Sequence, residues 1–156
     1  MSLLALGISH RTAPMALLEA VSLDARHRNV LRDRLVAAEH VGEAVVVSTC
    51  NRTEVYADVA TFHGGLAELT DALLEVTGVS RESLRDQLYV HYEDRAISHA
   101  FSVACGLDSM AVGEAQILGQ LRESLTQAQR HGHVGPVLNS LFQQALRVGK
   151  RAHAET

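Results

Sequence analysis

The sequence predicts an α+β fold, in which a four-stranded antiparallel sheet with two helices on one face precedes a small all-helical subdomain. Two observations lead to this prediction. Strand-like and helix-like segments follow one another in the order β-α-β-β-α-β over residues 1–92, which is the order of a ferredoxin-like sandwich. After Tyr92 only helical patterns follow. We therefore expect a ferredoxin-like α+β subdomain at 1–92 and a helical subdomain at 93–156.

Four segments of the first unit have the composition of strands: 3–9, 44–47, 55–59 and 88–92. The second is a continuous Ala-Val run, which is typical of a buried central strand. The third alternates apolar with polar residues, which predicts a strand with one buried face. Apolar residues at helical spacing predict helices at 24–40 and 66–76. Gly42 and Gly78 are expected to end these two helices.

Three further helices are predicted at 94–106, at 117–130 and from Pro136 onward, since proline suits the first helical position. The first of them has almost no polar face, so we expect it to be buried. The last helix keeps its helical composition through 150–156, where the sequence stops without a cap or a proline. This pattern predicts that the helix continues in a longer native protein, the alternative being a natural end that frays.

Composition narrows the class of protein. The chain is 47% hydrophobic and 21% charged, with a formal net charge of −4, a balance that does not indicate nucleic-acid binding. Residues 122–156 carry five basic against two acidic residues, which we interpret as a solvated helix face more readily than as a phosphate site. No signal peptide, membrane span or disulfide framework is visible. We therefore expect a reduced, cytoplasmic protein.

Cys50 is the candidate nucleophile. It follows the buried Val run, so the end of a rigid strand would position it, and its neighbours are all polar: Ser48, Thr49, Asn51, Arg52 and Thr53. Arg52 favours the thiolate, which is the nucleophilic form, while Thr49 and Asn51 are suited to donating hydrogen bonds to an oxyanion. A buried, inert cysteine is the alternative. We favour that alternative for Cys105, which lies in the apolar helix.

The histidines do not predict a metal site. The nine histidines contain one close pair, His131 and His133, in a glycine-bearing turn, and neither Cys-x-x-Cys nor His-Glu-x-x-His occurs. His99 differs because it lies in the apolar helix. It is either a core histidine or, if that helix packs beside the Cys50 loop, a general acid or base.

A second polar cluster occupies residues 108–120. Gln116 and Gln120 are four residues apart and share one helix face. The cluster is either a solvated helix cap or a set of donors and acceptors for a small polar substrate. Neither a Gly-x-Gly-x-x-Gly motif nor a P-loop is present, so we expect no nucleotide site in this chain.

Four stretches, in order and spanning nearly the whole chain, together resemble the glutamyl-tRNA reductase family: 7–14, 48–56, 106–120 and 150–156. The resemblance implies that Cys50 attacks the aminoacyl ester of glutamyl-tRNA and holds the glutamyl group as a thioester. Hydride from NADPH would then give glutamate-1-semialdehyde, the first committed product of tetrapyrrole synthesis by the five-carbon route.

The resemblance also implies residue roles. His99 matches a histidine that assists proton movement, and the substrate-contacting positions are Thr49, Asn51, Arg52, Ser109, Glu114, Ala115, Gln116 and Gln120. Ala115 stands where the family often has proline. The family carries an NADPH-binding domain and a dimerisation domain beyond this point, so we expect no cofactor or metal site here. Expected partners are glutamyl-tRNA, glutamate-1-semialdehyde aminomutase and a second copy of the full protein.

Two other functions remain open from the residues alone. Ferredoxin-like domains often serve as non-catalytic ligand-binding or regulatory modules. A cysteine hydrolase or a redox sensor is the third hypothesis, although no nearby His and Asn arrangement supports it.

Overall fold

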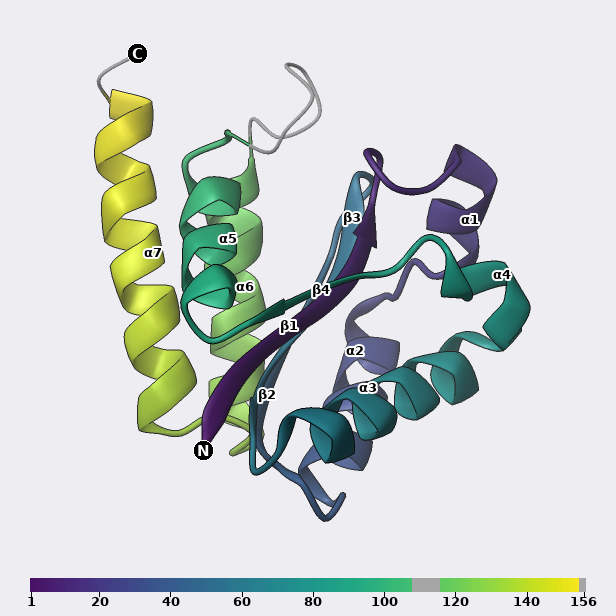
Figure 1. Ribbon diagram of the computed structural model, residues 1–156. Helices are drawn as coiled ribbons and strands as arrows, with labels where there is room; N and C mark the ends of the chain where they lie inside the picture. The colour runs from purple at the N-terminus through teal and green to yellow at the C-terminus, as the bar shows by residue number, and fades with distance from the viewer. Residues whose placement is uncertain (108–115, 155–156) are drawn as a thin grey trace.

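The computed structural model describes residues 1–107 and 116–154. Within these ranges the elements are β1 (Ser2–Ser9), α1 (Met15–Ala20), α2 (Ala25–Val36), β2 (Val41–Ser48), β3 (Arg52–Val59), α3 (Phe62–Thr77), α4 (Arg81–Arg85), β4 (Tyr89–Tyr92), α5 (Asp94–Ala104), α6 (Ile117–Arg130) and α7 (Pro136–Ala154). The sheet lies in the middle, with α2 and α3 on one face and α5, α6 and α7 on the other (Figure 1).

The sheet has the strand order β2-β3-β1-β4, and every neighbouring pair is antiparallel. This is the topology of a ferredoxin-like sandwich, so the predicted α+β fold is confirmed. The register brings Gly7 on β1 opposite Glu54 on β3 and opposite Tyr89 on β4. Three strands therefore meet at the level of these residues, close to the β2–β3 turn.

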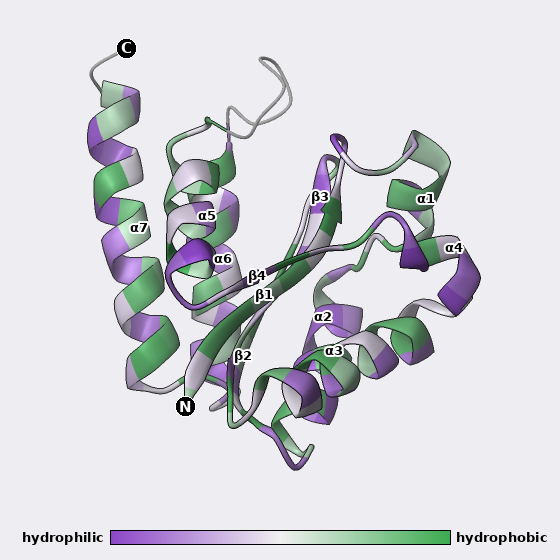
Figure 2. Ribbon diagram, viewed as in Figure 1, coloured by the Kyte–Doolittle hydropathy of each residue, from purple (hydrophilic) through white to green (hydrophobic). Residues whose placement is uncertain are grey.

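Two apolar cores lie on the two faces of the sheet. One contains alternate strand residues such as Leu4, Leu6 and Val46, packed under α2 and α3. The other contains the intervening residues, among them Ala5 and Val45, packed under the three later helices. In Figure 2, β1 is largely hydrophobic, whereas α7 alternates hydrophobic and hydrophilic bands as an amphipathic helix does. The helices at 94–154 thus share a core with the sheet, and a division into units at residue 92 stays a prediction.

Burial on both faces corrects two strand predictions. β2, expected to be central, is an edge strand, yet Ala44 to Val47 are all 0% exposed because helices cover both faces. β3, expected to be half-buried, is buried along its whole length. Its polar residues Glu54 and Asp58, which alternate as a solvent face would, point under the helical layer instead.

Three helix predictions also need correction. α2 ends at Val36 with Ala37 as its C-cap, and Gly42 lies in β2, beside a register irregularity, rather than ending a helix. α5 is buried along one stripe only, since Ile97 on its other side is 40% exposed. The short helix α4 was not predicted because five residues show too little periodicity.

Buried polar contacts fix the helical layer to the edge strand. Glu43 on β2 accepts hydrogen bonds from the backbone N–H groups of Val137 (3.2 Å) and Leu138 (2.9 Å), at the positive end of the α7 dipole. His133 accepts at Nδ1 from Arg32 Nε (3.0 Å) and donates from Nε2 to Asp33 (2.6 Å). The α6–α7 turn is therefore tied to α2 around the edge of the sheet.

The described residues contain no candidate membrane-spanning helix. None of their helices combines the length and the apolar character that crossing a bilayer requires.

Gly149 lets α7 approach the end of α5 closely. A Cβ atom at this position would lie 2.6 Å from the Ala104 carbonyl oxygen, which is closer than real contacts allow. His153 Nε2, one turn further on, bonds the same oxygen at 3.0 Å and so satisfies a carbonyl at the end of α5.

Gly149→Ala is expected to destabilise the protein by about 1–3 kcal/mol, because the backbone of α5 must move to admit a methyl group. The matched control is Gly119→Ala on α6, where an added Cβ meets nothing within 4 Å. That change should stabilise by about 0.5–1 kcal/mol through helix propensity alone. Urea unfolding of both variants measures the difference, and equal shifts for the two variants would contradict the close packing of α5 and α7.

Candidate active site

Cys50 lies at the tip of the turn between β2 and β3. β2 ends at Ser48 and β3 begins at Arg52, and the turn is closed by the Thr49 N–H donating to the Arg52 carbonyl oxygen at 2.8 Å. The Asn51 N–H donates to Thr49 Oγ1 at 3.1 Å. Cys50 is a free, exposed cysteine, so its sulfur is accessible to a substrate.

Two of the polar neighbours of Cys50 anchor the turn. Ser48 Oγ and Thr53 Oγ1 are hydrogen-bonded at 2.8 Å, and Ser48 Oγ also accepts from the Leu23 N–H at 2.9 Å. Thr53 Oγ1 donates to the Val21 carbonyl oxygen at 3.3 Å. These contacts bind the hairpin to the segment between α1 and α2, so the turn is held from below while its tip stays exposed.

Within the described residues, Asn51 carries a hydrogen-bond donor without a partner. The residue is 7% exposed, and its carbonyl oxygen accepts from the His10 N–H at 2.9 Å. Its side-chain Nδ2 is buried and finds no partner among the residues described. Leaving a buried donor unpaired costs about 1–3 kcal/mol, so an amide in this state beside an accessible thiol is a candidate donor to a ligand.

Behind the turn, the buried carboxylate of Glu54 collects four polar partners. Its oxygens accept from Arg52 (3.4 Å) and Tyr56 (2.9 Å), and also from Tyr89 and His99. We call these five residues the Glu54 cluster. Gly7 makes room for it, because a Cβ there would lie 2.8 Å from Glu54 Cγ and 2.7 Å from the Thr53 carbonyl oxygen.

The partners decide the charge of the cluster. Burial alone would raise the pKa of Glu54, but the hydrogen bond and charge of His99, the Arg52 charge and the Tyr89 hydrogen bond outweigh it and lower the pKa to about 2. Burial and the charge of Glu54 raise the pKa of Tyr56 well above its usual value. Glu54 is therefore an anion at neutral pH and Tyr56 a neutral donor to it.

His99 is held within the cluster. Its Nε2 pairs with Glu54, its side chain is 10% exposed, and its ring stacks on that of His91 with centroids 4.4 Å apart. The described residues show no hydrogen bond between His99 and Cys50. The role of His99 as a general acid or base stays a prediction.

Described residues of three of the stretches that the sequence singled out, 7–14, 48–56 and 106–120, meet at one end of the sheet. The loop after β1 bonds the Cys50 turn through His10 and Asn51, and Arg11 Nη2 bonds the Leu107 carbonyl oxygen weakly, at 3.5 Å. This end, where β1 stops and β2 turns into β3, is the upper end of the sheet in Figure 1.

Gln116 and Gln120 share one face, as expected. They line an open cleft of about 420 Å³ at the start of α6, and Gln120 Oε1 is buried there without a partner in the described ranges. Ser109, Glu114 and Ala115 lie outside the described residues, so their predicted substrate contacts have no structural description.

Sequence reasoning missed the polar interior of this site. Glu54 and Tyr56 were interpreted as the solvent side of an alternating strand, and Tyr89 and His91 as ordinary strand residues. A carboxylate, a tyrosine and a neighbouring arginine at 52–56 were the available signal. Cys105 also differs from expectation, since it lies partly exposed at the C-cap of α5 and not in a core.

One group of residues away from Cys50 has side chains that could bind a metal ion, whereas the sequence predicted no metal site. Glu39, His40 and Glu68 hold their ligand atoms within 4.8 Å of one another. Glu68 already bonds both the backbone N–H and Nδ1 of His40, at 2.8 Å each, and this hydrogen bond raises the pKa of His40. His40 and Glu68 therefore form an ion pair with Glu39 beside it, and we assign this group no metal.

Fold and site together define a class: a ferredoxin-like α+β domain that presents an exposed thiol at a hairpin tip, in front of a buried carboxylate–histidine cluster. The chain belongs to the glutamyl-tRNA reductase family, because the family model described as "Glutamyl-tRNAGlu reductase, N-terminal domain" matches residues 6–156.

Individual relatives agree with this assignment. The chain is 61% identical to a glutamyl-tRNA reductase of Thermobifida fusca and 60% identical to one of Streptomyces coelicolor, in both cases over 100% of this chain but over 33% and 27% of the relative. Among solved structures, glutamyl-tRNA reductase from Methanopyrus kandleri matches with a TM-score of 0.76 at 30% identity. That match covers 99% of this chain and 35% of the other. The chain thus spans about a third of the length of the proteins it resembles.

Glu54 should make the protein sensitive to acid. Its pKa is lower in the folded than in the unfolded chain, so its contribution to stability is complete above about pH 4.5 and is lost as the pH falls toward 2. Between pH 5 and pH 3 we expect this group to remove about 2 kcal/mol from the free energy of unfolding. Glu54→Gln should abolish that part of the pH dependence, while lowering stability at pH 7. Urea unfolding at the three pH values measures both effects.

The matched control is Asp24→Asn, because Asp24 also has a lowered pKa but is fully exposed, and asparagine can still cap α2. This variant should keep the acid sensitivity that Glu54 causes. Equal pH profiles for wild type and Glu54→Gln would show that Glu54 is not a buried anion.

Proposed function

We propose that this chain is the acyl-accepting catalytic domain of a glutamyl-tRNA reductase. The Cys50 thiolate attacks the carbonyl carbon of the ester that joins glutamate to tRNA. The S–C bond forms, the ester C–O bond breaks, and the ribose oxygen of the tRNA leaves and takes up a proton. The exposure of the Cys50 thiol at a hairpin tip is the observation that carries this proposal. The enzyme keeps the activation of the ester in the thioester.

The neighbours of Cys50 suit the two charges of this reaction. We propose that the buried Nδ2 of Asn51, which has no partner among the described residues, donates together with Thr49 to the oxyanion that develops on the carbonyl oxygen. Arg52 is the proposed partner of a substrate carboxylate, although its guanidinium is 0% exposed and already pairs with Glu54. Gln116 and Gln120 are proposed to contact the glutamyl group from the start of α6, together with Ser109, Glu114 and Ala115.

His99 is proposed to move the proton that the leaving oxygen needs. Glu54 binds its Nε2, and such a carboxylate–imidazole pair fixes the orientation of the ring. Nδ1 is then the nitrogen available to the substrate. In this arrangement His99 acts on the substrate and not on the sulfur, in keeping with the lack of a hydrogen bond to Cys50 in the described part of the chain.

Reduction requires a part of the protein that lies outside this chain. Enzymes of the family use NADPH, whose hydride reduces the thioester to glutamate-1-semialdehyde. The sequence contains no glycine-rich phosphate cradle for a dinucleotide, so the residues of this chain carry the reaction only to the thioester. We further propose that the reaction takes place in the cytoplasm, that the full protein dimerises through residues outside this chain, and that glutamate-1-semialdehyde aminomutase takes up the aldehyde.

The thioester is tested with tRNA carrying radiolabelled glutamate. Wild type and the matched control Cys105→Ser should retain label in acid-precipitated, RNase-treated protein, and hydroxylamine should release it as it releases thioesters. Cys50→Ser should retain none, because serine at the turn lacks an ionisable thiol.

A p-nitrophenyl ester of glutamate provides a second measurement that does not depend on tRNA binding. A burst of p-nitrophenol equal to the protein concentration is expected from wild type and not from Cys50→Ser. Labelling of Cys50→Ser equal to that of wild type would contradict the proposal. So would the lack of both label and burst in wild type, which would favour a non-catalytic binding module.

A further inference from the structure

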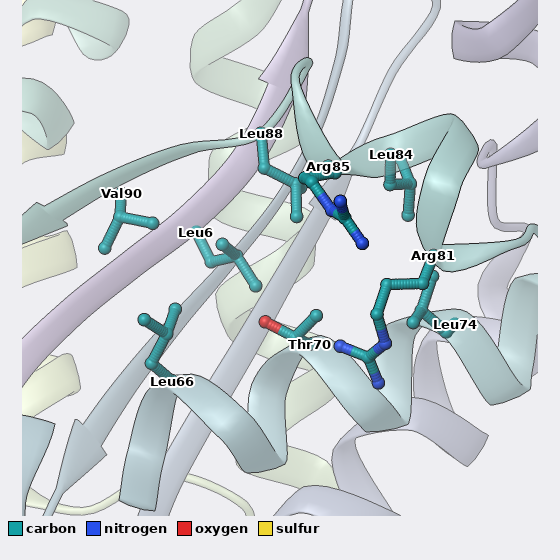
Figure 3. Close-up of a pocket in the computed structure, with 9 residues that line it drawn as sticks. All are labelled: Leu6, Leu66, Thr70, Leu74, Arg81, Leu84, Arg85, Leu88 and Val90. Atoms are coloured by element: carbon teal, nitrogen blue, oxygen red, sulfur yellow. The ribbon is translucent and has the colours of Figure 1, made fainter. Parts of the chain in front are cut away.

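A second cleft lies on the face of the sheet opposite the Glu54 cluster. It has a volume of about 260 Å³ and is enclosed by β1, α3, α4 and β4 (Figure 3). Six of its nine lining residues are aliphatic, among them Leu66 and Leu74 on α3 and Val90 on β4. The other three are Thr70, Arg81 and Arg85. An apolar pocket with a few convergent polar groups is the usual form of a small-molecule site.

The cleft opens where the sheet ends. β4 is an edge strand that pairs only with β1 within the described residues, and Val90 on it is 36% exposed. α4 and the residues after it lead from α3 to β4 and form one wall of the cleft. Leu84 and Leu88 of this segment point into the cleft (Figure 3). Covering apolar surface that is open to water in this way favours the binding of an apolar ligand.

Two arginines place positive charge at the opening of the cleft. Arg81 and Arg85 are four residues apart on α4, and Figure 3 shows both side chains extending toward the cleft, into which the Thr70 hydroxyl also points. Arg81 Nη2 bonds Asp71 Oδ1 at 2.5 Å, so part of its charge is compensated. Arg85 forms no ion pair with any residue that the structure describes, and its guanidinium is available to an anion.

We propose that this cleft binds a small amphipathic carboxylic acid. The apolar tail would lie against the leucines and Val90, and the carboxylate would accept hydrogen bonds from the two guanidinium groups and from Thr70. Arginine matches the planar carboxylate with two parallel N–H donors. An apolar cavity of about 150 Å³ is enough to bind benzene, so the larger volume of this cleft suits an acyl tail of several carbons.

The position of the cleft connects it with the Glu54 cluster through two strands. Leu6 on β1 pairs with Val90 on β4, and both line the cleft. The next pair along the same strands is Gly7 and Tyr89, which lie against Glu54 on the other face. A ligand in the cleft would therefore contact, from behind, the strands that position the cluster.

Titration of the chain with octanoate, followed by ¹H–¹⁵N NMR, tests the proposal. Saturable shifts are expected at Thr70, Leu84 and Val90. Octanol, which has the tail without the charge, should bind about tenfold more weakly, and the double variant Arg81→Gln/Arg85→Gln should weaken octanoate by about tenfold or more. The matched control is Arg130→Gln, an exposed arginine on α6, which should bind as wild type does.

Val90→Phe gives an independent check because it fills the cleft from an exposed edge and should abolish the shifts. Equal affinity for octanoate and octanol, or undiminished octanoate binding by the double arginine variant, would overturn the proposal. A third outcome would also overturn the proposal: the chain self-associates without octanoate, and Val90→Phe abolishes this association. The cleft would then be a contact between two copies of the chain.

Discussion

A buried negative charge sets the geometry of this domain. An ionised carboxylate at the interface of a sheet and a helical layer costs several kcal/mol unless it is fully paired. Glu54 is paired by side chains from three elements, namely Arg52 and Tyr56 on its own strand, Tyr89 on β4 and His99 on α5. Any movement of β4 or α5 relative to β3 would break one of these bonds, so the cluster fixes these elements in one arrangement.

The pairing of Glu54 also helps to fix the position of the turn that carries Cys50. β3 begins at Arg52, which belongs to the cluster, so the strand is held from its first residue. Ser48 and Thr53 hold the base of the turn, while Cys50 is exposed and Asn51 Nδ2 has no partner among the described residues. A hydrogen-bond donor held on a rigid frame is what a preorganised site for a developing oxyanion requires.

Local patterns in the sequence were sufficient to predict most helices and strands and the turn that carries Cys50. The apolar stripes predicted α6 with both its bounds, and Pro136 predicted the start of α7. The Val run followed by polar residues predicted that Cys50 follows a strand end. Each of these features depends on residues within one turn or one strand, where side-chain periodicity follows directly from backbone geometry.

The Glu54 cluster could not be predicted in the same way, because its members lie far apart in the chain. Glu54 is 35 residues from Tyr89 and 45 from His99. The alternation in β3 was interpreted as a strand with one solvent-exposed face. A single sequence does not reveal that helices α5 to α7 cover that face of the sheet. The same unforeseen helical layer explains why β2 looked central although it is an edge strand. α5 looked wholly buried because it has almost no polar face, although one side of it is open.

The central claim is that Glu54 is a buried anion, and measuring the pKa of Glu54 in the folded chain tests it most directly. Side-chain carboxyl ¹³C NMR, with the Glu54 signal assigned by its loss in Glu54→Gln, follows that group directly as the pH is lowered. The resonance should keep the chemical shift of a carboxylate through pH 4 and pH 3 and begin to titrate only near about 2. A midpoint at 4.5 or above would contradict the account, because Glu54 would then be an ordinary or neutral carboxyl group that cannot hold His99 and Arg52 as an anion does.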